Sequence, residues 1–385
     1  MIDIVCIGIP KWEGNYAKST VELLKELSKN HRILYIEYQY TLKDLLWGFT
    51  NKSIPVKKLL GINPRIVEKK IEGRVIHVMT LPPLLPINWI GSFAIYLMGL
   101  RINSFILRRY IKKAIRRLAF KNHAVIYAFT PFYALHNINK LDESKNVYYC
   151  YDEIRESNWL KKYGGQVEEL ILPKVDKVIV TSDTLYQNRK LLAKKVYLVK
   201  NGVNYNVFAR YFSEEIQVEK PIIGFVGSLD FRIDFKLLKD VISKFPKAKF
   251  IFVGRVESLT EVESLKSFPN VELVPPQPYE HLPQIIRNFS VGIIPFLTNE
   301  FTKSIYPMKI NEYFALGKPV VMTSFANLPE FDGEIGVANN PEQFLSLLEN
   351  EIKNDSSAKA IRRREMAKAN SWEKRAELFS EYLLY

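Results

Sequence analysis

Short apolar runs alternate with amphipathic segments along most of the chain. The runs are typical of buried strands, and the segments between them repeat their apolar residues with the period of a helix. Such an alternation predicts doubly wound α/β structure with parallel sheets. We expect helices at 20–29, 235–244 and 282–289. We expect strands at 2–9, 32–37, 74–79, 124–129, 146–150, 177–181, 195–199, 222–226, 249–253, 271–273 and 291–296.

The alternation occurs twice within 385 residues, which is enough chain for two domains with separate cores. We expect Rossmann-like domains over residues 1–205 and 216–370. Parallel sheets bind ligands at the carboxyl ends of their strands, so two such domains would leave a ligand cleft between them. Residues 371–385 begin with a potential N-cap, Ser371, and continue with an amphipathic pattern. They predict a final helix that crosses back onto the N-terminal domain.

Residues 291–324 read as strand, loop, helix and strand. Pro307 fits the first helical turn, and Gly317 can end the helix in a left-handed conformation. Lys309 and Glu312 lie three residues apart and therefore share a helix face. Near a helix N-terminus, which attracts anions, this pair suits a phosphate for Lys309 and a sugar diol for Glu312. A solvent-exposed Lys–Glu pair is the alternative.

The pattern from Pro307 to Val321, P-x-K-x-x-E-Y-x-A-x-G-K-P-V-V, resembles the nucleotide-binding segment of GT-B glycosyltransferases of the GT4-like group. The resemblance implies that Glu312 holds the ribose and Lys309 the diphosphate of a nucleotide sugar. Many GT4 enzymes have a second Glu at the position of Ser304, and this departure leaves the donor sugar and the stereochemistry open. The Pro-Met-Lys-x-x-Glu variant is similar to teichuronic-acid-type transferases and to the xanthan glucuronosyltransferase.

Further candidate contacts with the nucleotide sugar lie on loops that the family layout brings near this pair. A glycine between a strand and a helix lets backbone N–H groups approach a phosphate. The loop at 275–279 would flank the base, although an ordinary proline-rich loop is the simpler alternative, and Trp12 is a candidate for the acceptor side. The candidate residues are Gly14, Asn15, Gly227, Ser228, Arg232, Gly254, Arg255, Thr302, Lys303, Ser304 and Met308.

A catalytic base is expected directly after the strand at 146–150. An inverting transfer needs a group that takes the proton of the acceptor hydroxyl, and a carboxylate at a strand's carboxyl end can serve. The xanthan enzyme uses an Asp of its N-terminal domain, and that similarity implies Asp152 here, with Glu153 as the second candidate. A helix-capping role for Asp152 is the alternative.

Neither a metal nor a cofactor is expected. No Asp-x-Asp motif occurs, and the five histidines have no ligand spacing, which argues against the metal-dependent GT-A alternative. The two cysteines, Cys6 and Cys150, are far apart in the sequence and fit a reducing cytoplasmic setting. The apolar run at the N-terminus follows no basic segment and reads as a core strand.

Positive charge is concentrated in the first half of the chain. Residues 1–200 hold 33 basic and 17 acidic side chains, against 22 and 24 in the remainder. Residues 81–100 carry no charge, but three prolines leave a smooth helical stretch too short to cross a membrane. The next twenty residues form a basic amphipathic pattern that suits an anionic membrane surface. The candidates in these two segments are Trp89, Arg108, Arg109, Lys112, Lys113, Arg116 and Arg117.

This basic stretch also fits two roles away from a membrane. Nucleic acid is a rival target for a positive face, but no nucleic-acid-binding module is readable in the sequence, so no nucleic-acid partner is expected. A core helix whose basic face is simply solvated is the second alternative, and it stays open.

These features together predict a metal-independent glycosyltransferase at the cytoplasmic face of the membrane. It would move a sugar from a nucleoside diphosphate sugar, in particular a UDP-sugar, to a hydroxyl of a lipid-linked saccharide acceptor in surface polysaccharide biosynthesis. A nucleotide-sugar epimerase of the same fold is one alternative. A non-catalytic scaffold that binds membrane or nucleic acid is another.

Overall fold

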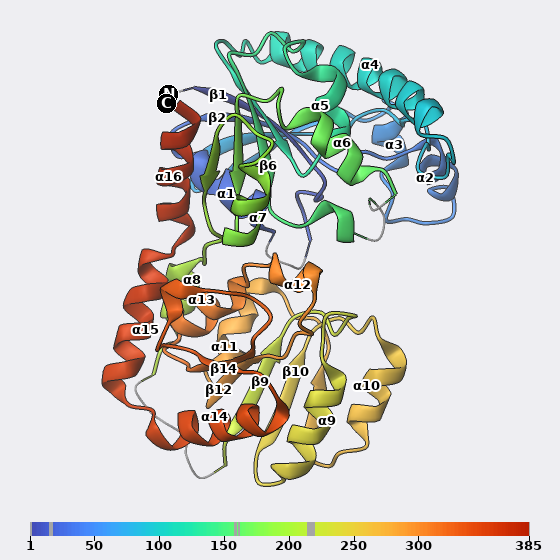
Figure 1. Ribbon diagram of the computed structural model, residues 1–385. Helices are drawn as coiled ribbons and strands as arrows, with labels where there is room; N and C mark the ends of the chain where they lie inside the picture. The colour runs from blue at the N-terminus through green and yellow to red at the C-terminus, as the bar shows by residue number, and fades with distance from the viewer. Residues whose placement is uncertain (1, 15–17, 158–159, 161, 214–219, 385) are drawn as a thin grey trace. The chain divides into compact units, whose positions relative to one another are not determined.

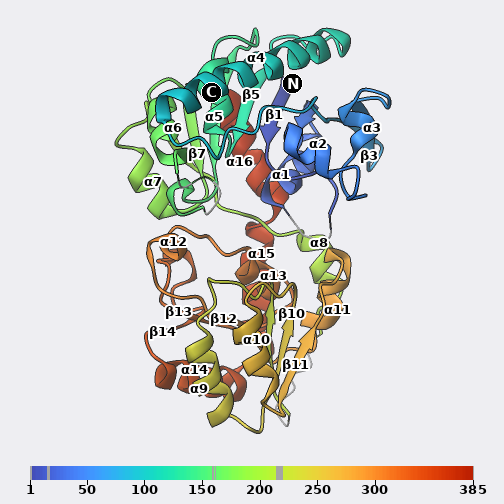
Figure 2. The ribbon, with the colours of Figure 1, turned by 90° about the vertical axis from the view of Figure 1, so that its right-hand side faces the viewer.

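The computed structural model describes the chain except residues 1, 15–17, 158–159, 161, 214–219 and 385. The described residues form two compact units (Figures 1 and 2). The first runs up to Lys200 and takes in the residues from Ala376 onward, and the second runs from Asn201 to Arg375. The second unit begins earlier than the expected residue 216 because α8 (Tyr205–Ala209) packs on two of its helices.

The first unit is built on a sheet in the order β3-β4-β2-β1-β5-β6-β7-β8. Its neighbouring strands are parallel except for the β3–β4 pair. The strands are β1 (Asp3–Gly8), β2 (Arg32–Ile36), β3 (Ile66–Ile71), β4 (Arg74–Met79), β5 (Ala124–Ala128), β6 (Lys145–Cys150), β7 (Lys177–Val180) and β8 (Val196–Leu198).

Helices cover both faces of this sheet (Figure 1). The apolar sides of α4, α5 and α6 pack together over one face, and the C-terminal part of α16 packs on the other through Phe379 on Tyr149 and Tyr382 on Tyr197. The helices are α1 (Ser19–Leu27), α2 (Leu42–Trp47), α3 (Val56–Leu59), α4 (Phe93–Arg117), α5 (Pro131–Asn137), α6 (Gly164–Ile171), α7 (Asp183–Arg189) and α16 (Trp372–Leu384), with a 3-10 turn, η1, at Ile154–Glu156.

The second unit has a parallel sheet in the order β11-β10-β9-β12-β13-β14. The chain reverses its direction of winding between β9 and β12, and in open α/β sheets ligands bind at such a switch point. The strands are β9 (Ile222–Val226), β10 (Lys249–Val253), β11 (Val271–Val274), β12 (Val291–Ile294), β13 (Val320–Thr323) and β14 (Gly336–Ala338).

The helices of the second unit also lie on both faces of its sheet. Helices α8, α13 and α15 pack together, and α9 packs with α14. The helices are α9 (Phe235–Lys244), α10 (Leu259–Lys266), α11 (Leu282–Ile286), α12 (Glu300–Lys303), α13 (Met308–Ala315), α14 (Pro341–Asn354) and α15 (Ser357–Ala369), with 3-10 turns η2 at Tyr279–His281 and η3 at Pro329–Phe331.

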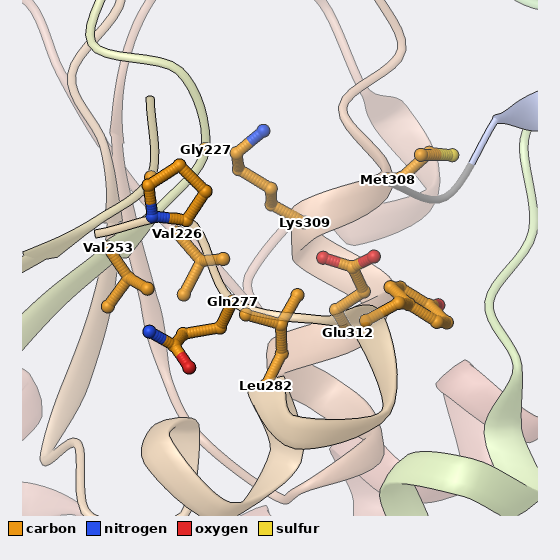
Figure 3. Close-up of a pocket in the computed structure, with 11 residues that line it drawn as sticks. Val226, Gly227, Val253, Gln277, Leu282, Met308, Lys309 and Glu312 are labelled. Atoms are coloured by element: carbon orange, nitrogen blue, oxygen red, sulfur yellow. The ribbon is translucent and has the colours of Figure 1, made fainter. Parts of the chain in front are cut away.

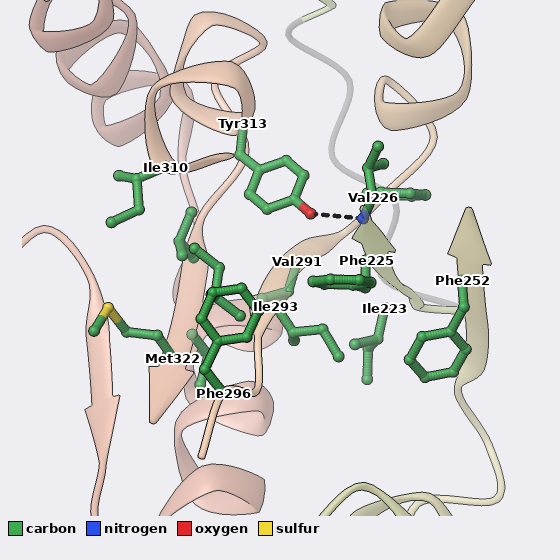
Figure 4. Packing of buried hydrophobic residues seen from close by; sticks show 14 of the residues in the cluster. Ile223, Phe225, Val226, Phe252, Val291, Ile293, Phe296, Ile310, Tyr313 and Met322 are labelled. Atoms are coloured by element: carbon green, nitrogen blue, oxygen red, sulfur yellow. Dashed lines mark hydrogen bonds between the residues drawn. The ribbon is translucent and has the colours of Figure 1, made fainter. Parts of the chain in front are cut away.

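The core of the second unit fixes α13 on the central strands. Figure 4 shows Tyr313 of α13 above the apolar side chains of β9 and β12, where its hydroxyl accepts a hydrogen bond of 3.0 Å from the Val226 backbone N–H. Gly292 of β12 lies under the same ring, and a Cβ there would come within 2.4 Å of it. The absence of a side chain at Gly292 therefore sets how closely the helix approaches the sheet.

The two ends of the second unit meet. Val203 and Ser371 form a parallel bridge, in which the Val203 N–H donates to the Asn370 carbonyl and the Trp372 N–H donates to the Val203 carbonyl. Asn370 also donates through its side chain to Asn311 of α13 at 3.0 Å. Both places where the chain enters and leaves this unit are thus held to one helix.

The doubly wound α/β prediction is confirmed, and most expected strands lie within a residue or two of the observed ones. The antiparallel strand β3 was missed, because Glu68 and Lys70 are exposed on it and no apolar run marks it. It joins β4 through a two-residue turn at Glu72 and Gly73, whose φ values of 47° and 79° are those of a tight hairpin.

Candidate active site

The strongest candidate site is a pocket of about 110 Å³ in the second unit (Figure 3). It lies where β9 and β10 end and α13 begins, at the carboxyl edge of the sheet. Its walls combine apolar side chains with one cation and one carboxylate, the composition of a site for a ligand that is part apolar and part charged. The lining residues are Val226, Gly227, Val253, Gly254, Pro276, Gln277, Tyr279, Leu282, Met308, Lys309 and Glu312.

Two glycines at the strand ends give the pocket its floor. Gly227 and Gly254 both have a φ of 151°, and the Gly227 N–H donates to the Val253 carbonyl at 2.8 Å. A Cβ on Gly254 would lie 2.0 Å from the Gly227 carbonyl oxygen, and one on Gly227 would lie 2.6 Å from Cε of Lys309. Both positions require glycine, because any side chain would displace the backbone or the lysine.

Helix α13 is fixed at its C-terminal end as expected from Gly317. This glycine has a φ of 71°; its N–H donates to the Phe314 carbonyl, while the Lys318 N–H donates to the Tyr313 carbonyl. These two bonds make a Schellman motif. The buried Arg363 donates two further bonds to the Gly317 carbonyl, at 2.9 and 2.7 Å. At the opposite end Pro307 is extended and precedes the helix, so it does not form the first turn as expected.

Lys309 and Glu312 extend from α13 along one side of the pocket, with Lys309 reaching towards Gly227 (Figure 3). The pKa of Lys309 is lowered to about 8, chiefly by burial and then by Arg232, whereas Glu312 and Asp230 oppose the shift. Burial likewise raises the pKa of the Glu312 carboxyl, against the effects of Lys309 and of a hydrogen bond from Tyr279. Glu312 is buried and Lys309 is half-buried, so each would interact more strongly with a charged or hydroxylated ligand than it would in open water.

Arg232 lies near this cation but belongs to a separate pair. Its guanidinium donates two hydrogen bonds to the buried Asp230 carboxylate, at 2.9 and 2.6 Å, and lies 5.3 Å from the ring centre of Phe296. Lys309 is held against the same ring, at 5.9 Å, and against Phe225 at 5.5 Å. The pocket thus has a positive side made by Lys309, with Arg232 behind it.

The chain is similar to known glycosyltransferases in this unit and in its whole fold. Residues 220–354 match the family model of glycosyl transferases group 1. The putative teichuronic acid biosynthesis glycosyltransferase TuaH of Bacillus subtilis is 26% identical over 271 residues, which are 64% of this chain and 68% of that protein.

Three solved structures share the fold over 98% or more of both chains. The α,α-trehalose-phosphate synthase (UDP-forming) of Burkholderia xenovorans has a TM-score of 0.72 at 10% identity, with all of both chains covered. The catalytic domain of Starch Synthase IV from Arabidopsis thaliana, bound to ADP and acarbose, has 0.66 at 13%, covering 99% of this chain and 98% of that one. Anabaena HepE in complex with UDP has 0.64 at 13%, covering 100% and 99%. The protein is a GT-B glycosyltransferase.

Of the residues that the sequence proposed for the nucleotide-sugar site of this glycosyltransferase, five line the pocket: Gly227, Gly254, Met308, Lys309 and Glu312. The loop at 275–279 also contributes, through Pro276, Gln277 and Tyr279. Leu282, Val226 and Val253 were not foreseen. Their apolar character is ordinary for an α/β core, and only the fold brings them to one place.

The remaining proposed residues of the second unit lie outside the pocket lining. Thr302 is fully buried and caps α12, its hydroxyl donating to the Leu297 carbonyl at 2.5 Å and accepting from the Asn299 N–H at 3.1 Å. The Thr302 hydroxyl is thus used within the loop, which argues against a ligand contact. Ser304 is buried at the end of α12, and Lys303 is exposed and pairs with Glu300. Arg255 is exposed and pairs with Glu257, and Ser228 is half-buried.

In the first unit of the glycosyltransferase the two candidate bases differ sharply. Asp152 is half-buried directly after β6, in the expected position at the carboxyl end of a strand. Glu153 is buried, and both its carboxylate oxygens accept from Arg189, at 2.8 and 3.1 Å. Arg189 also pairs with Glu168 at 2.9 Å. Glu153 is thus part of a buried ion-pair cluster, which gives it a structural role and argues against a role as base.

Gly14 is exposed, with a φ of 150°, and Asn15 lies outside the described residues. Trp12 is half-buried and packs on Tyr35, with ring centres 5.6 Å apart. Neither Gly14 nor Trp12 lines the pocket of the second unit.

The basic stretch forms the C-terminal half of α4. Arg109, Lys113, Arg116 and Arg117 are exposed, whereas Arg108 donates to the His136 carbonyl and Lys112 pairs with Asp142 at 2.8 Å. Ahead of them Trp89 is exposed, as are four apolar side chains of α4 at helical spacing, Ile95, Met98, Ile102 and Phe105. Among the described residues, none of the helices is both long and apolar enough to span a bilayer.

Proposed function

We propose that this glycosyltransferase moves a sugar from a nucleoside diphosphate sugar, in particular a UDP-sugar, to a hydroxyl of a lipid-linked saccharide used for surface polysaccharide. The convergence of Lys309, Glu312 and Gly227 in one pocket carries the donor part of this proposal. The starch synthase and HepE structures, which have the same fold, were solved with ADP and UDP. The B. subtilis relative is named for teichuronic acid biosynthesis, which supports the polysaccharide part.

In this proposal Lys309 and the N-terminal turn of α13 bind the diphosphate, and Gly227 lets the backbone approach it. Glu312 accepts hydrogen bonds from the two ribose hydroxyls. The base lies against Val253, Leu282 and the loop that contains Gln277. As the bond between the sugar and the diphosphate breaks, the charge that develops on the leaving oxygen is stabilised by Lys309 without a metal ion.

Thermal-shift measurements with UDP, GDP and ADP, each with and without EDTA, test the donor part. One nucleotide should raise the melting temperature, because a ligand that binds the native state stabilises it, and EDTA should not reduce the shift. Glu312→Gln should weaken that nucleotide roughly tenfold or more, since a hydrogen bond to a charged group contributes about 1.5–3 kcal/mol. Glu261→Gln, an exposed carboxylate of α10, is the control. No response of the parent protein to any nucleotide would contradict the proposal.

For the chemical step we propose Asp152 as the base. It would take the proton of the acceptor hydroxyl while that oxygen attacks the anomeric carbon and the nucleoside diphosphate leaves. The position of Asp152 after β6 supports this role. Glu153 is not proposed, because both of its carboxylate oxygens accept hydrogen bonds from Arg189.

Asp152→Asn should abolish sugar transfer while the nucleotide thermal shift stays as in the parent protein. The matched control is Glu156→Gln, an exposed carboxylate on the adjacent 3-10 turn, which should transfer normally. Normal turnover of Asp152→Asn would eliminate this assignment. The same assay separates the alternatives, because an epimerase would convert the nucleotide sugar with no acceptor present, and a scaffold would show no donor-dependent chemistry.

For the acceptor part we propose that α4 lies on an anionic membrane surface at the cytoplasmic face. Its exposed arginines and lysines would contact lipid headgroups, and its exposed Ile95, Met98, Ile102 and Phe105 would enter the interfacial layer. An acceptor with a lipid tail would then stay in the bilayer while its saccharide reaches the enzyme.

A further inference from the structure

A second exposed apolar surface lies in the first unit, between β2 and β3. We call it the α2–α3 surface. Its side chains are between 43% and 71% exposed, and α2 has no buried residue at all. Single exposed apolar side chains need no explanation, whereas six large ones within the short segment 42–62 indicate a surface that something covers. The surface consists of Leu42, Leu46, Trp47, Phe49, Leu60 and Ile62.

The segment that carries this surface is held in shape independently of it. Thr41 and Asp44 form a capping box at the start of α2. Tyr40, Ile54 and Leu59 make a small separate core beneath. The backbone on either side of Thr41 pairs with Leu84, with two N–H···O distances of 2.8 Å. The fold of the segment is therefore satisfied by groups outside the surface, and the outward aromatic side chains are free to serve a partner.

The charges around the surface favour a lipid over a protein as that partner. Lys43, Lys52 and Lys57 are exposed in the same segment, and Lys58 is half-buried beside them. The acid of the segment, Asp44, is engaged by Thr41, whose N–H and hydroxyl both donate to it at 2.7 Å. Lysines are depleted in protein interfaces, whereas next to a bilayer they extend to anionic headgroups as aromatic rings enter the interfacial layer.

The α2–α3 surface is structurally joined to α4. Arg65 donates to the Leu59 carbonyl at 2.7 Å and lies 5.3 Å from the ring centre of Tyr110 of α4. Asn103 of α4 exchanges two hydrogen bonds with the Leu85 backbone, next to the Leu84 that pairs with Thr41.

We propose that the α2–α3 surface inserts into the interfacial layer of an anionic bilayer, with Trp47 and Phe49 as its anchors, as a second contact beside α4. This inference rests on the proposed membrane function of α4, but it concerns different residues. Two contacts joined in one unit bind more tightly than either alone and limit how the unit can rotate on the surface.

Vesicle co-sedimentation of the full chain tests the proposal, with phosphatidylcholine vesicles that contain or lack phosphatidylglycerol. Trp47→Ser with Phe49→Ser should weaken binding to the anionic vesicles about tenfold or more while leaving every charge in place. The matched control is Leu191→Ser with Leu192→Ser, an exposed apolar pair elsewhere in the first unit, which should bind like the parent protein. The serine variants should keep the parent's melting temperature, since the replaced side chains are exposed.

Arg109→Glu with Lys113→Glu on α4 separates the two proposals. If this variant loses vesicle binding and the Trp47/Phe49 variant does not, α4 keeps its membrane role and the inference on the α2–α3 surface is overturned. If the parent protein sediments with neither vesicle, both are overturned. Light scattering tests whether a second copy of the chain covers the α2–α3 surface instead of lipid. A parent dimer that the Trp47/Phe49 substitutions dissociate would also overturn the lipid proposal.

Discussion

Lys309 is a half-buried cation whose surroundings stabilise it only in part. Burial and then repulsion by Arg232 lower its pKa to about 8, although two aromatic rings lie beneath the ammonium group. A diphosphate placed at this position would restore a favourable environment for the charge and raise the pKa again. Binding of a nucleotide and protonation of Lys309 should therefore be coupled.

This coupling predicts a pH dependence of nucleotide binding. The affinity for UDP should be nearly constant below pH 7, where Lys309 is charged without ligand. It should fall as the pH rises through 8, by up to about tenfold per pH unit, because binding then requires uptake of a proton. Titration calorimetry from pH 6.5 to 9.5 measures it, and Lys309→Met should bind weakly and lack this dependence. Constant affinity of the parent protein up to pH 9.5 would refute the coupling.

The same lowered pKa of Lys309 gives the free energy of unfolding a pH dependence opposite in sign to that of nucleotide affinity. The folded-state pKa of Lys309 lies below its unfolded value, so between about pH 8 and 10.4 the unfolded chain binds more protons at this site. Without ligand, the contribution of Lys309 to the free energy of unfolding should rise with pH across that window.

At the scale of elements, α13 carries the proposed donor-binding residues and is fixed by contacts near its C-terminal end. Tyr313 ties it to the end of β9, and the Schellman motif at Gly317 ties its last turn to Arg363. Its first turn faces the pocket. The precision of the site therefore depends on bonds that do not touch the ligand.

Tyr313→Phe tests this dependence. The substitution leaves the buried Val226 N–H without its acceptor, which should lower the free energy of unfolding by about 1–3 kcal/mol. Thermal unfolding measures the loss, and the affinity for the stabilising nucleotide should fall with it. Tyr127→Phe is the control, because the buried Tyr127 hydroxyl has no hydrogen-bond partner among the described residues. Equal effects of the two variants would argue against a special role for the Tyr313 bond.

The sequence predicted those elements whose pattern is local. Apolar runs marked the parallel strands, and the spacing of Lys309 and Glu312 placed both on one helix face. The α2–α3 surface was not foreseen, because exposed apolar residues look like core residues until their burial is known. The role of Glu153 depends on Arg189, 36 residues away, which only the fold brings to it. Thr302 differs, because its partner Asn299 is only three residues away and their capping box is a local signal that the sequence analysis did not use.

At the scale of the whole molecule, each unit has its own core. The core of the second unit runs from Val203 to Ala367 and lies entirely within it. The bridge between Val203 and Ser371 closes this unit next to α13. An autonomous core with joined ends is what an independently folding domain requires.

The segment 201–375 should therefore fold alone. Expressed by itself, it should unfold in one cooperative thermal transition and be stabilised by the same nucleotide as the full chain. The matched control is the segment 216–370, which lacks α8 and the Val203–Ser371 bridge and should be less stable or unfolded. Circular dichroism and thermal shift measure both. A non-cooperative transition in the longer segment would show that it depends on the rest of the chain.

The meeting of those two ends has a consequence for engineering and for descent. Because the chain enters and leaves this unit at adjacent positions, the unit can be exchanged for the corresponding unit of a relative through only two junctions. The short backbone bridge between Val203 and Ser371 lies at both junctions. A circular permutation of this unit, in which its two ends are joined directly and new termini are opened in another loop, should likewise leave the pocket intact. Under the proposed function, donor preference would then pass from one enzyme to another while the proposed acceptor side in the first unit stays unchanged.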